Sequence, residues 1–181
     1  MAEQETTPVT NGSGDAGTAS DNGDPQISVL AQYIKDLSVE NPSAPQVFQW
    51  EDQAALDVQF NIQVDSVGEG VHEIVLKIDV SARSAKGIHF VVDLSYAGLL
   101  ALRNIPEEAL GPFLLIEAPR LIFPFARQVV ADAVAGAGFP PLLLDPIDFA
   151  GAYMAQLQAA QDAAGEAGAD SPAPADTPTD S

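Results

Sequence analysis

The chain has 181 residues, of which 26 are acidic and 7 are basic, so its formal net charge at pH 7 is -19. A chain this acidic repels phosphate backbones and anionic membranes, which argues against nucleic-acid binding and favours a basic protein partner. It has no cysteine, which excludes disulfides, thiolate metal sites and cysteine nucleophiles.

Two acidic tails flank the predicted folded body. Residues 1–25 and 162–181 are poor in bulky apolar side chains, and each tail holds five acids and no base. Such segments cannot bury enough surface to offset the entropy of ordering, so we expect both to be disordered. Residues 26–161 are predicted to form one domain. The N-terminus lacks signal-peptide features and no apolar run has membrane-spanning length, so we expect a soluble cytoplasmic protein.

The first predicted strand lies in QYIKDLSVENPSAPQVF, residues 32–48. Alternation places the even-numbered residues on one face of this strand: Ile34, Asp36, Ser38 and Glu40. The other face carries Tyr33, Leu37 and Val39. At about 3.3 Å per residue, Asp36 and Glu40 lie about 13 Å apart. A glycosidase carboxylate pair needs roughly 5 to 9.5 Å, so this spacing instead suits a surface for a basic partner.

Three further strands follow, joined by links of hairpin length. Apolar and polar residues alternate from Leu56 to Asp65, from Val71 to Arg83 and from Ile88 to Tyr96. Short glycine-containing turns predict an antiparallel meander. Because strands fill the chain up to about residue 98 and helical patterns follow from about 106, the sequence predicts an α+β fold.

The first helical stretch, residues 106–138, is interrupted by proline. We expect kinks or two segments at three positions, Pro112, Pro119 and Pro124. Gly136 and Gly138 predict the helix end. Residues 113–116, FLLI, are apolar all round, and in a small domain another subunit is a natural cover for such a helix, so we expect an oligomer.

The last helix is predicted from LLLDPIDFAGAYMAQLQAA, residues 142–160. Asp145 suits the N-cap and Pro146 the first helical position. A stripe at helical spacing follows, which we interpret as core packing: Ile147, Ala150, Met154 and Leu157.

The sequence contains few candidates for catalytic or metal-binding residues. The two histidines are His72 and His89, and alternation places His89 on one face with Val91 and Asp93. No nucleophile motif or third ligand accompanies them, so we expect no enzyme activity, no metal and no cofactor. A surplus of aromatic residues remains, and the loop-like position of Trp50 is typical of an edge or groove residue.

Four stretches carry a family resemblance: YIKDLSVENPSAPQVF, VHEIVLKIDVSA, LIFPFARQVVADAV and GFPPLLLDPIDFAGAYM. Over about residues 30–160 the chain resembles the SecB protein-export chaperones. The resemblance implies a four-stranded antiparallel sheet packed with helices, assembled as a dimer of dimers. Such proteins hold unfolded precursor proteins in an export-competent state in the cytoplasm, without ATP or cofactor, and pass them to SecA, the translocation motor.

The resemblance also implies three sets of site residues. SecA, through a basic C-terminal segment that carries its own zinc, docks on an acidic sheet surface, which falls here on Asp36, Glu40, Val91 and Asp93. The groove for unfolded clients falls on Phe48, Trp50, Leu56, Val58, Phe60, Tyr153 and Met154. A strand involved in subunit contacts matches Phe90, Val92, Leu94 and Tyr96.

Three alternatives stay open. The chain could be a SecB-like chaperone dedicated to one partner, such as the antitoxin of a toxin–antitoxin pair. A pull-down would distinguish such a chaperone from a general export chaperone. A small-molecule-binding or enzymatic α+β domain could use His89 and Asp93, and activity lost on His89→Ala without effect on client aggregation would favour it. The third alternative is a purely structural oligomer.

Overall fold

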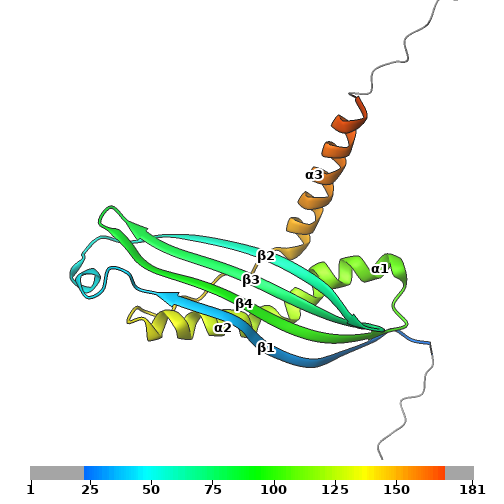
Figure 1. The fold of residues 1–181 in the computed structure, drawn as a ribbon, viewed down its shortest axis with the longest axis horizontal. Helices are drawn as coiled ribbons and strands as arrows, with labels where there is room; N and C mark the ends of the chain where they lie inside the picture. The colour runs from blue at the N-terminus through cyan, green and yellow to red at the C-terminus, as the bar shows by residue number, and fades with distance from the viewer. Residues whose placement is uncertain (1–22, 170–181) are drawn as a thin grey trace, which may run out of the picture.

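The computed structural model describes residues 23–169, which form a four-stranded antiparallel sheet with helices (Figure 1). Residues 1–22 and 170–181, which make up most of the two predicted tails, lie outside the described residues. The strands hydrogen-bond in the order β1-β4-β3-β2, with the bounds β1 Gln26–Glu40, β2 Ala55–Gly68, β3 Val71–Ser84 and β4 Gly87–Arg103. The predicted meander of β2, β3 and β4 is confirmed, and β1 pairs with the free edge of β4.

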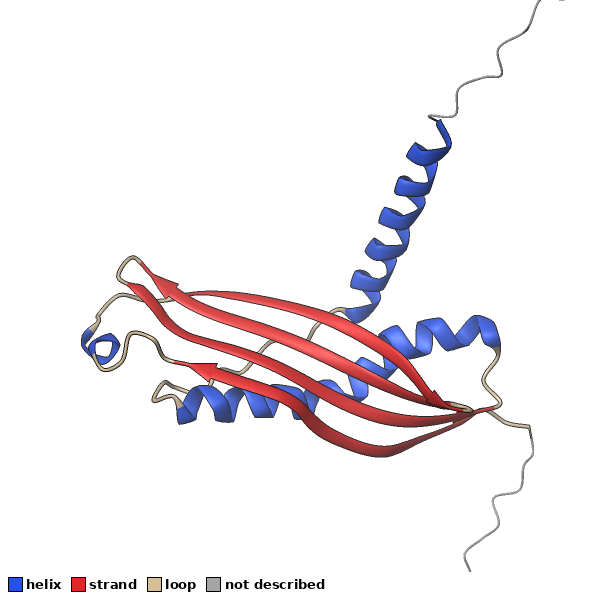
Figure 2. Ribbon diagram, in the orientation of Figure 1, coloured by secondary structure: helices blue, strands red, loops and turns tan. Residues whose placement is uncertain are grey.

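The helices follow the strands, as the sequence predicts, except for a short 3-10 turn, η1 (Gln46–Gln49). Helix α1 (Glu107–Pro112) passes through a π-helical turn, η2 (Phe113–Glu117), into α2 (Ala118–Gly136). Helix α3 (Phe149–Ala169) comes last. Figure 2 shows α2 running along the sheet while α3 projects away from it. The sheet therefore has one face next to helices and one open face.

The core lies between α2 and the two central strands. Strands β3 and β4 contribute residues of even number that are fully buried: Ile74, Leu76, Ile78, Val92, Leu94 and Leu100. α2 contributes Ile122, Ala126 and Val130, which are also fully buried. At Gly98 a Cβ would lie 2.8 Å from Ile122 Cγ2, so glycine allows this close approach of helix and sheet. The 30-residue run Glu107–Gly136 is long and apolar enough to cross a membrane, but a core helix passes the same test.

A β-bulge in β1 changes the predicted faces of that strand. Its register with β4 jumps from Ile34 to Asp36, leaving Lys35 as the extra residue. Because an inserted residue reverses the alternation, Ile34 lies on the helix side and Tyr33 on the open side, the opposite of the prediction. The grouping of Asp36 with Glu40 is confirmed, because both follow the bulge.

The proline-rich helical run is continuous rather than broken. Pro112 ends α1 and the π-helical turn begins at the next residue. Proline has no N–H and its ring crowds the preceding turn, and the wider π spacing accommodates this. Pro119 lies directly after this π-helical turn, where the hydrogen-bond pattern of the helix already changes, so its missing N–H falls at that change. The predicted end is confirmed: Gly138 has φ 92° and donates its N–H to Ala135 O at 3.0 Å.

Helix α3 begins later than predicted. Asp148, not Asp145, caps it, since Asp148 Oδ1 accepts the Gly151 N–H at 3.0 Å. Asp145 and Pro146 lie in the extended segment before the helix. α3 continues to Ala169, past the predicted domain boundary at residue 161.

Candidate functional site

The open face of the sheet brings together the four residues predicted to dock SecA. Glu40 pairs with Val91 across β1 and β4, and Ser38, between Glu40 and Asp36, pairs with Asp93. Directly paired residues of antiparallel strands share a face. Asp36, Glu40, Val91 and Asp93 therefore form one surface on two adjacent strands.

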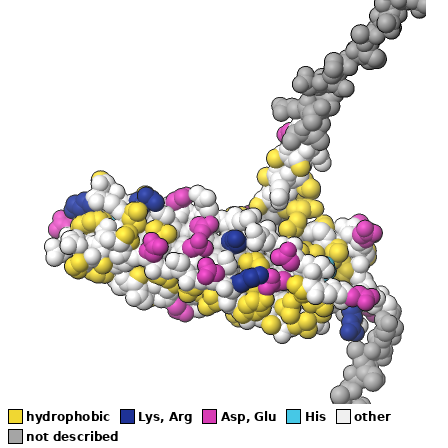
Figure 3. Space-filling view, in the orientation of Figure 1, with side chains coloured by type: hydrophobic (Ala, Val, Ile, Leu, Met, Phe, Trp, Pro, Cys, Tyr) yellow, Lys and Arg dark blue, Asp and Glu magenta, His cyan; other side chains and the backbone are white. Residues whose placement is uncertain are grey.

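This surface continues onto β3 and β2, which the sequence reasoning missed. Asp79 of β3 pairs with Asp93. Asp57 of β2 pairs with Ser81, which in turn pairs with Val91. Figure 3 shows acidic side chains spread over the strands. The polar positions of β2 and β3 were visible in the alternation, but only the strand order places them beside β4. We call Asp36, Glu40, Asp57, Asp79 and Asp93 the acidic face.

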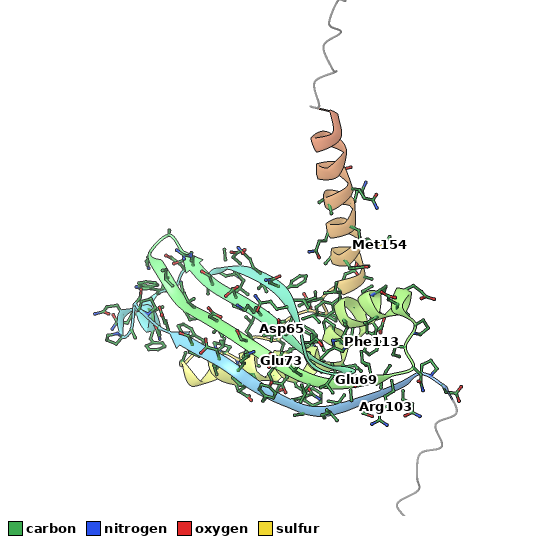
Figure 4. All side chains as sticks on the ribbon, turned by 45° about the vertical axis from the view of Figure 1, so that its right-hand side comes forward. Asp65, Glu69, Glu73, Arg103, Phe113 and Met154 are labelled. Carbon is green, nitrogen blue, oxygen red and sulfur yellow. The ribbon has the colours of Figure 1, made fainter. Side chains whose placement is uncertain are left out.

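Beside the acidic face lies a hydrogen-bonded group of three side chains. Glu73 of β3 is only 8% exposed. Its Oε2 accepts Lys35 Nζ at 2.6 Å, and its Oε1 accepts the Tyr33 hydroxyl. The hydrogen bond from Lys35, followed by the one from Tyr33, lowers the pKa of Glu73. The hydrogen bond to Glu73 raises the pKa of Tyr33 and also that of Lys35. Glu73 thus stays ionised with both oxygens occupied. Figure 4 labels Glu73 and Asp65, its partner across β2 and β3.

The helix side of β2 carries two hollows that contain four of the predicted groove residues. One hollow, of about 280 Å³, is lined by Leu56 and Val58 and by the segment before α3: Leu142, Leu143, Leu144, Asp145 and Ile147. The other, of about 220 Å³, contains Phe60 and Tyr153 and lies against the start of α3. Phe60 also packs edge-on against the buried Phe149, with ring centroids 5.8 Å apart. The hollows therefore follow one another along β2.

The other predicted groove residues are placed differently. Phe48 is 55% exposed and packs on Phe139, three residues after the end of α2, with ring centroids 5.6 Å apart. Trp50 meets His89 edge-on at 5.1 Å. Met154 is exposed on α3 next to Tyr153 but lines neither hollow (Figure 4). Phe48 and Trp50 thus form an aromatic group at one end of the sheet.

His89 does not share a face with Asp93 as predicted. The register of β3 and β4 is irregular at Ala82 and Arg83, which leaves His89 as an extra residue. Its ring turns toward Trp50 and Phe139 and is 8% exposed. In the described part of the chain no hydrogen bond or ion pair joins His89 to Asp93, and no group of three or more His, Asp and Glu side chains could hold a metal ion.

The residues predicted for subunit contact lie in the core of the single chain. Phe90, Val92, Leu94 and Tyr96 are 0–7% exposed. They occupy the face of β4 that packs against the helices. Little of their surface is therefore left for another subunit. Alternation alone does not distinguish a strand buried within a chain from one buried between chains. Besides the hollows of β2, a row of exposed apolar residues on this side lies on β1: Ile27, Val29, Ile34, Leu37 and Val39.

Comparison with known proteins gives a consistent result. The family model described as "Preprotein translocase subunit SecB" matches residues 20–160. A protein-export protein SecB of Sphingopyxis alaskensis is 58% identical over 137 residues, covering 76% of this chain and 80% of the relative. One from Zymomonas mobilis is 54% identical over 134 residues, covering 74% and 82%.

A solved structure shares the fold. It is the Mycobacterium tuberculosis Rv1957 SecB-like chaperone in complex with a ChAD peptide from the Rv1956 HigA1 antitoxin. Its TM-score is 0.56 at 16% identity, over 67% of this chain and 90% of the other.

Proposed function

The chain belongs to the SecB family of protein-export chaperones, and we propose that it holds unfolded precursors on the helix side of its sheet and delivers them to SecA through the acidic face. It acts in the cytoplasm and uses neither ATP nor a cofactor. The observation that carries the proposal is the separation of two surfaces on one sheet: apolar hollows on one side and carboxylates on the other. A client and a motor can therefore bind at the same time.

Client binding is driven by burial of apolar surface in the hollows along β2. Leu56, Val58 and Phe60 are 37–51% exposed, so they have surface left to cover. Each Å² removed from water contributes roughly 25 cal/mol. Hollows of this size hold single side chains rather than a folded motif. A long unfolded chain gains affinity by touching several hollows at once, which gives low sequence specificity. Phe48 and Trp50 extend the surface at the end of the sheet.

Docking of SecA is driven by charge. Asp79 and Asp93 face each other across β3 and β4, and like charges directly opposite are unfavourable. A basic partner segment relieves this repulsion. Val91 supplies an apolar contact among the carboxylates, in a shallow hollow that also contains Asp57 and Asp79. Exposed charges of this kind mainly set the association rate and its salt dependence.

Assembly as a dimer of dimers is part of the proposal. The exposed apolar row on β1 supports it, since a long edge strand with such side chains needs a cover. Exposed Leu121 and Phe125 of α2, one helical turn apart, offer a second contact. We place the subunit contacts on these two surfaces instead of on the buried residues of β4.

A crossed pair of variants tests the two surfaces. Asp36→Lys with Glu40→Lys should abolish SecA binding and leave client binding intact. Val58→Asp should weaken client binding and leave SecA binding intact, because Val58 lies on the opposite face. Glu117→Lys with Asp132→Lys makes the same charge change on the helical run and is the matched control. Normal SecA binding by the Asp36 and Glu40 variant would show that the acidic face is only solvated.

A further inference from the structure

The bulge in β1 puts a base and an acid next to each other on the open face. Lys35 is the extra residue of the bulge and contacts Glu73 on that face, and Asp36 follows at once and pairs with Ser95 on the same face. Neighbouring opposite charges normally attract one another. Here Lys35 Nζ lies 2.6 Å from Glu73 Oε2, and in the described part of the chain no ion pair involves Asp36.

We propose that Glu73 is a positioning residue that holds Lys35 away from Asp36 and so keeps the acidic face free for its basic partner. The proposal rests on the proposed function, because it concerns the same docking surface. It assigns Glu73 no contact with the partner. Glu73 acts through Lys35. While Glu73 binds the ammonium group of Lys35, that positive charge stays away from Asp36.

The geometry supports a holding role rather than a contact role. Both carboxylate oxygens of Glu73 are occupied, one by Lys35 and one by Tyr33, and the residue is 8% exposed. The side chain of Lys35 is 48% exposed, so it can change conformation once the carboxylate of Glu73 is removed. Tyr33 bonds the carboxylate oxygen that Lys35 does not use, which makes Glu73 a preformed acceptor.

The hollow around Asp36 shows what Lys35 would do if released. Lys35, Asp36 and Lys77 line one hollow of the open face, of about 310 Å³. With Lys35 paired to Glu73, Lys77 is the base of this hollow that has no ion pair among the described residues. A released Lys35 would add a second mobile positive charge beside Asp36, within the docking surface. Such a charge repels a basic segment and competes with it for the same carboxylate.

The test is a double-mutant cycle on the full chain. The probe is the zinc-loaded basic C-terminal segment of SecA, and its affinity is measured at low salt for four variants: Glu73→Gln, Lys35→Met, both together, and Glu69→Gln. Glu69 lies exposed in the turn between β2 and β3, has no ion pair among the described residues and undergoes the same Glu→Gln change, so it is the matched control. Glutamine keeps the shape of Glu73 and an acceptor for Tyr33, and circular dichroism checks the fold.

We expect Glu73→Gln to weaken binding about three- to fivefold, the range of an exposed charge interaction. Lys35→Met should bind as well as the parent chain or more tightly, and the double variant should bind like Lys35→Met. Glu69→Gln should change affinity less than about twofold. Rescue by Lys35→Met would not follow from a merely structural role of Glu73.

Two results overturn the proposal while leaving the proposed function standing. One is weaker binding by Lys35→Met alone, which would make Lys35 a contact residue. The other is equal weakening by Glu73→Gln with and without Lys35→Met, which would make the carboxylate act by itself. If the parent chain does not bind the SecA segment at all, both the proposed function and this inference fail.

Discussion

The hydrogen bonds of Glu73 link the stability of the fold to pH. Lys35 and Tyr33 both favour the ionised carboxylate, so the pKa of Glu73 is lowered from its ordinary value of 4.5. A group with a lowered folded pKa stabilises the fold above its unfolded pKa and loses that contribution as pH falls through the folded one. The window therefore lies below about pH 4.5.

Glu73→Gln should lower the free energy of unfolding by about 1 kcal/mol at pH 7, since it removes hydrogen bonds to a charged acceptor. The difference from the parent chain should shrink as pH falls below 4.5, because the unfolded chain then takes up a proton while the folded carboxylate, with its lowered pKa, is still ionised. Thermal melts across pH 3 to 7 measure it. Asp65→Asn on the same face should show a smaller difference at pH 7, and a gap for Glu73→Gln that stays constant down to pH 3 would contradict the linkage.

At the scale of elements, the cap of α3 decides where that helix begins. Asp148 Oδ1 accepts the Gly151 N–H, one of the N–H groups that a helix start leaves unpaired. The hollows of the proposed client groove depend on this start, because Asp145 and Ile147 before the cap line one hollow and Tyr153 after it lines the other.

Asp148→Ala should cost about 1 kcal/mol of stability, the usual loss for an N-cap aspartate. Asp145→Ala, three residues earlier and exposed, should change stability by less than about 0.5 kcal/mol. Urea titration of both variants measures the difference. Equal losses for the two would mean that the helix begins near Asp145, as the sequence pattern predicts.

Periodicity predicted most of the sheet because one face of each central strand is apolar and buried and the other face carries most of its charged residues. It failed where a single residue is inserted. The bulge at Lys35 exchanged Tyr33 and Ile34, and the irregularity at Ala82 turned His89 away from Asp93. An inserted residue leaves the composition of a strand unchanged, and only the pairing with a neighbouring strand reveals it.

Proline and capping signals pointed to places where a helix changes or begins, but not to the form of the change. Pro112 is followed by a π-helical turn within one continuous run, because the backbone can widen locally instead of breaking. For α3 two aspartates were compatible with the cap, and Asp145 and Ile147 line the hollow of Leu56 and Val58 instead of lying within the helix. Tertiary packing of this kind overrides a local preference.

At the scale of the whole molecule, one sheet carries the two proposed binding surfaces on opposite sides. The four docking positions came from the family resemblance, and the strand pairing of the structure groups them on one face. Asp57 and Asp79 could not be added from the sequence, since their place beside β4 depends on the strand order. The groove residues divide between two hollows and one aromatic group for the same reason: they come from distant segments.

The central claim, that the chain holds unfolded precursors, is tested most directly by mass measurement with light scattering. Four copies of an 18.9 kDa chain give about 76 kDa, and adding an unfolded precursor without ATP should raise this mass by that of the precursor. The same precursor already folded should leave the mass unchanged, and Val58→Asp should weaken the complex. A mass of 18.9 kDa, or no increase with excess unfolded precursor, would contradict the account.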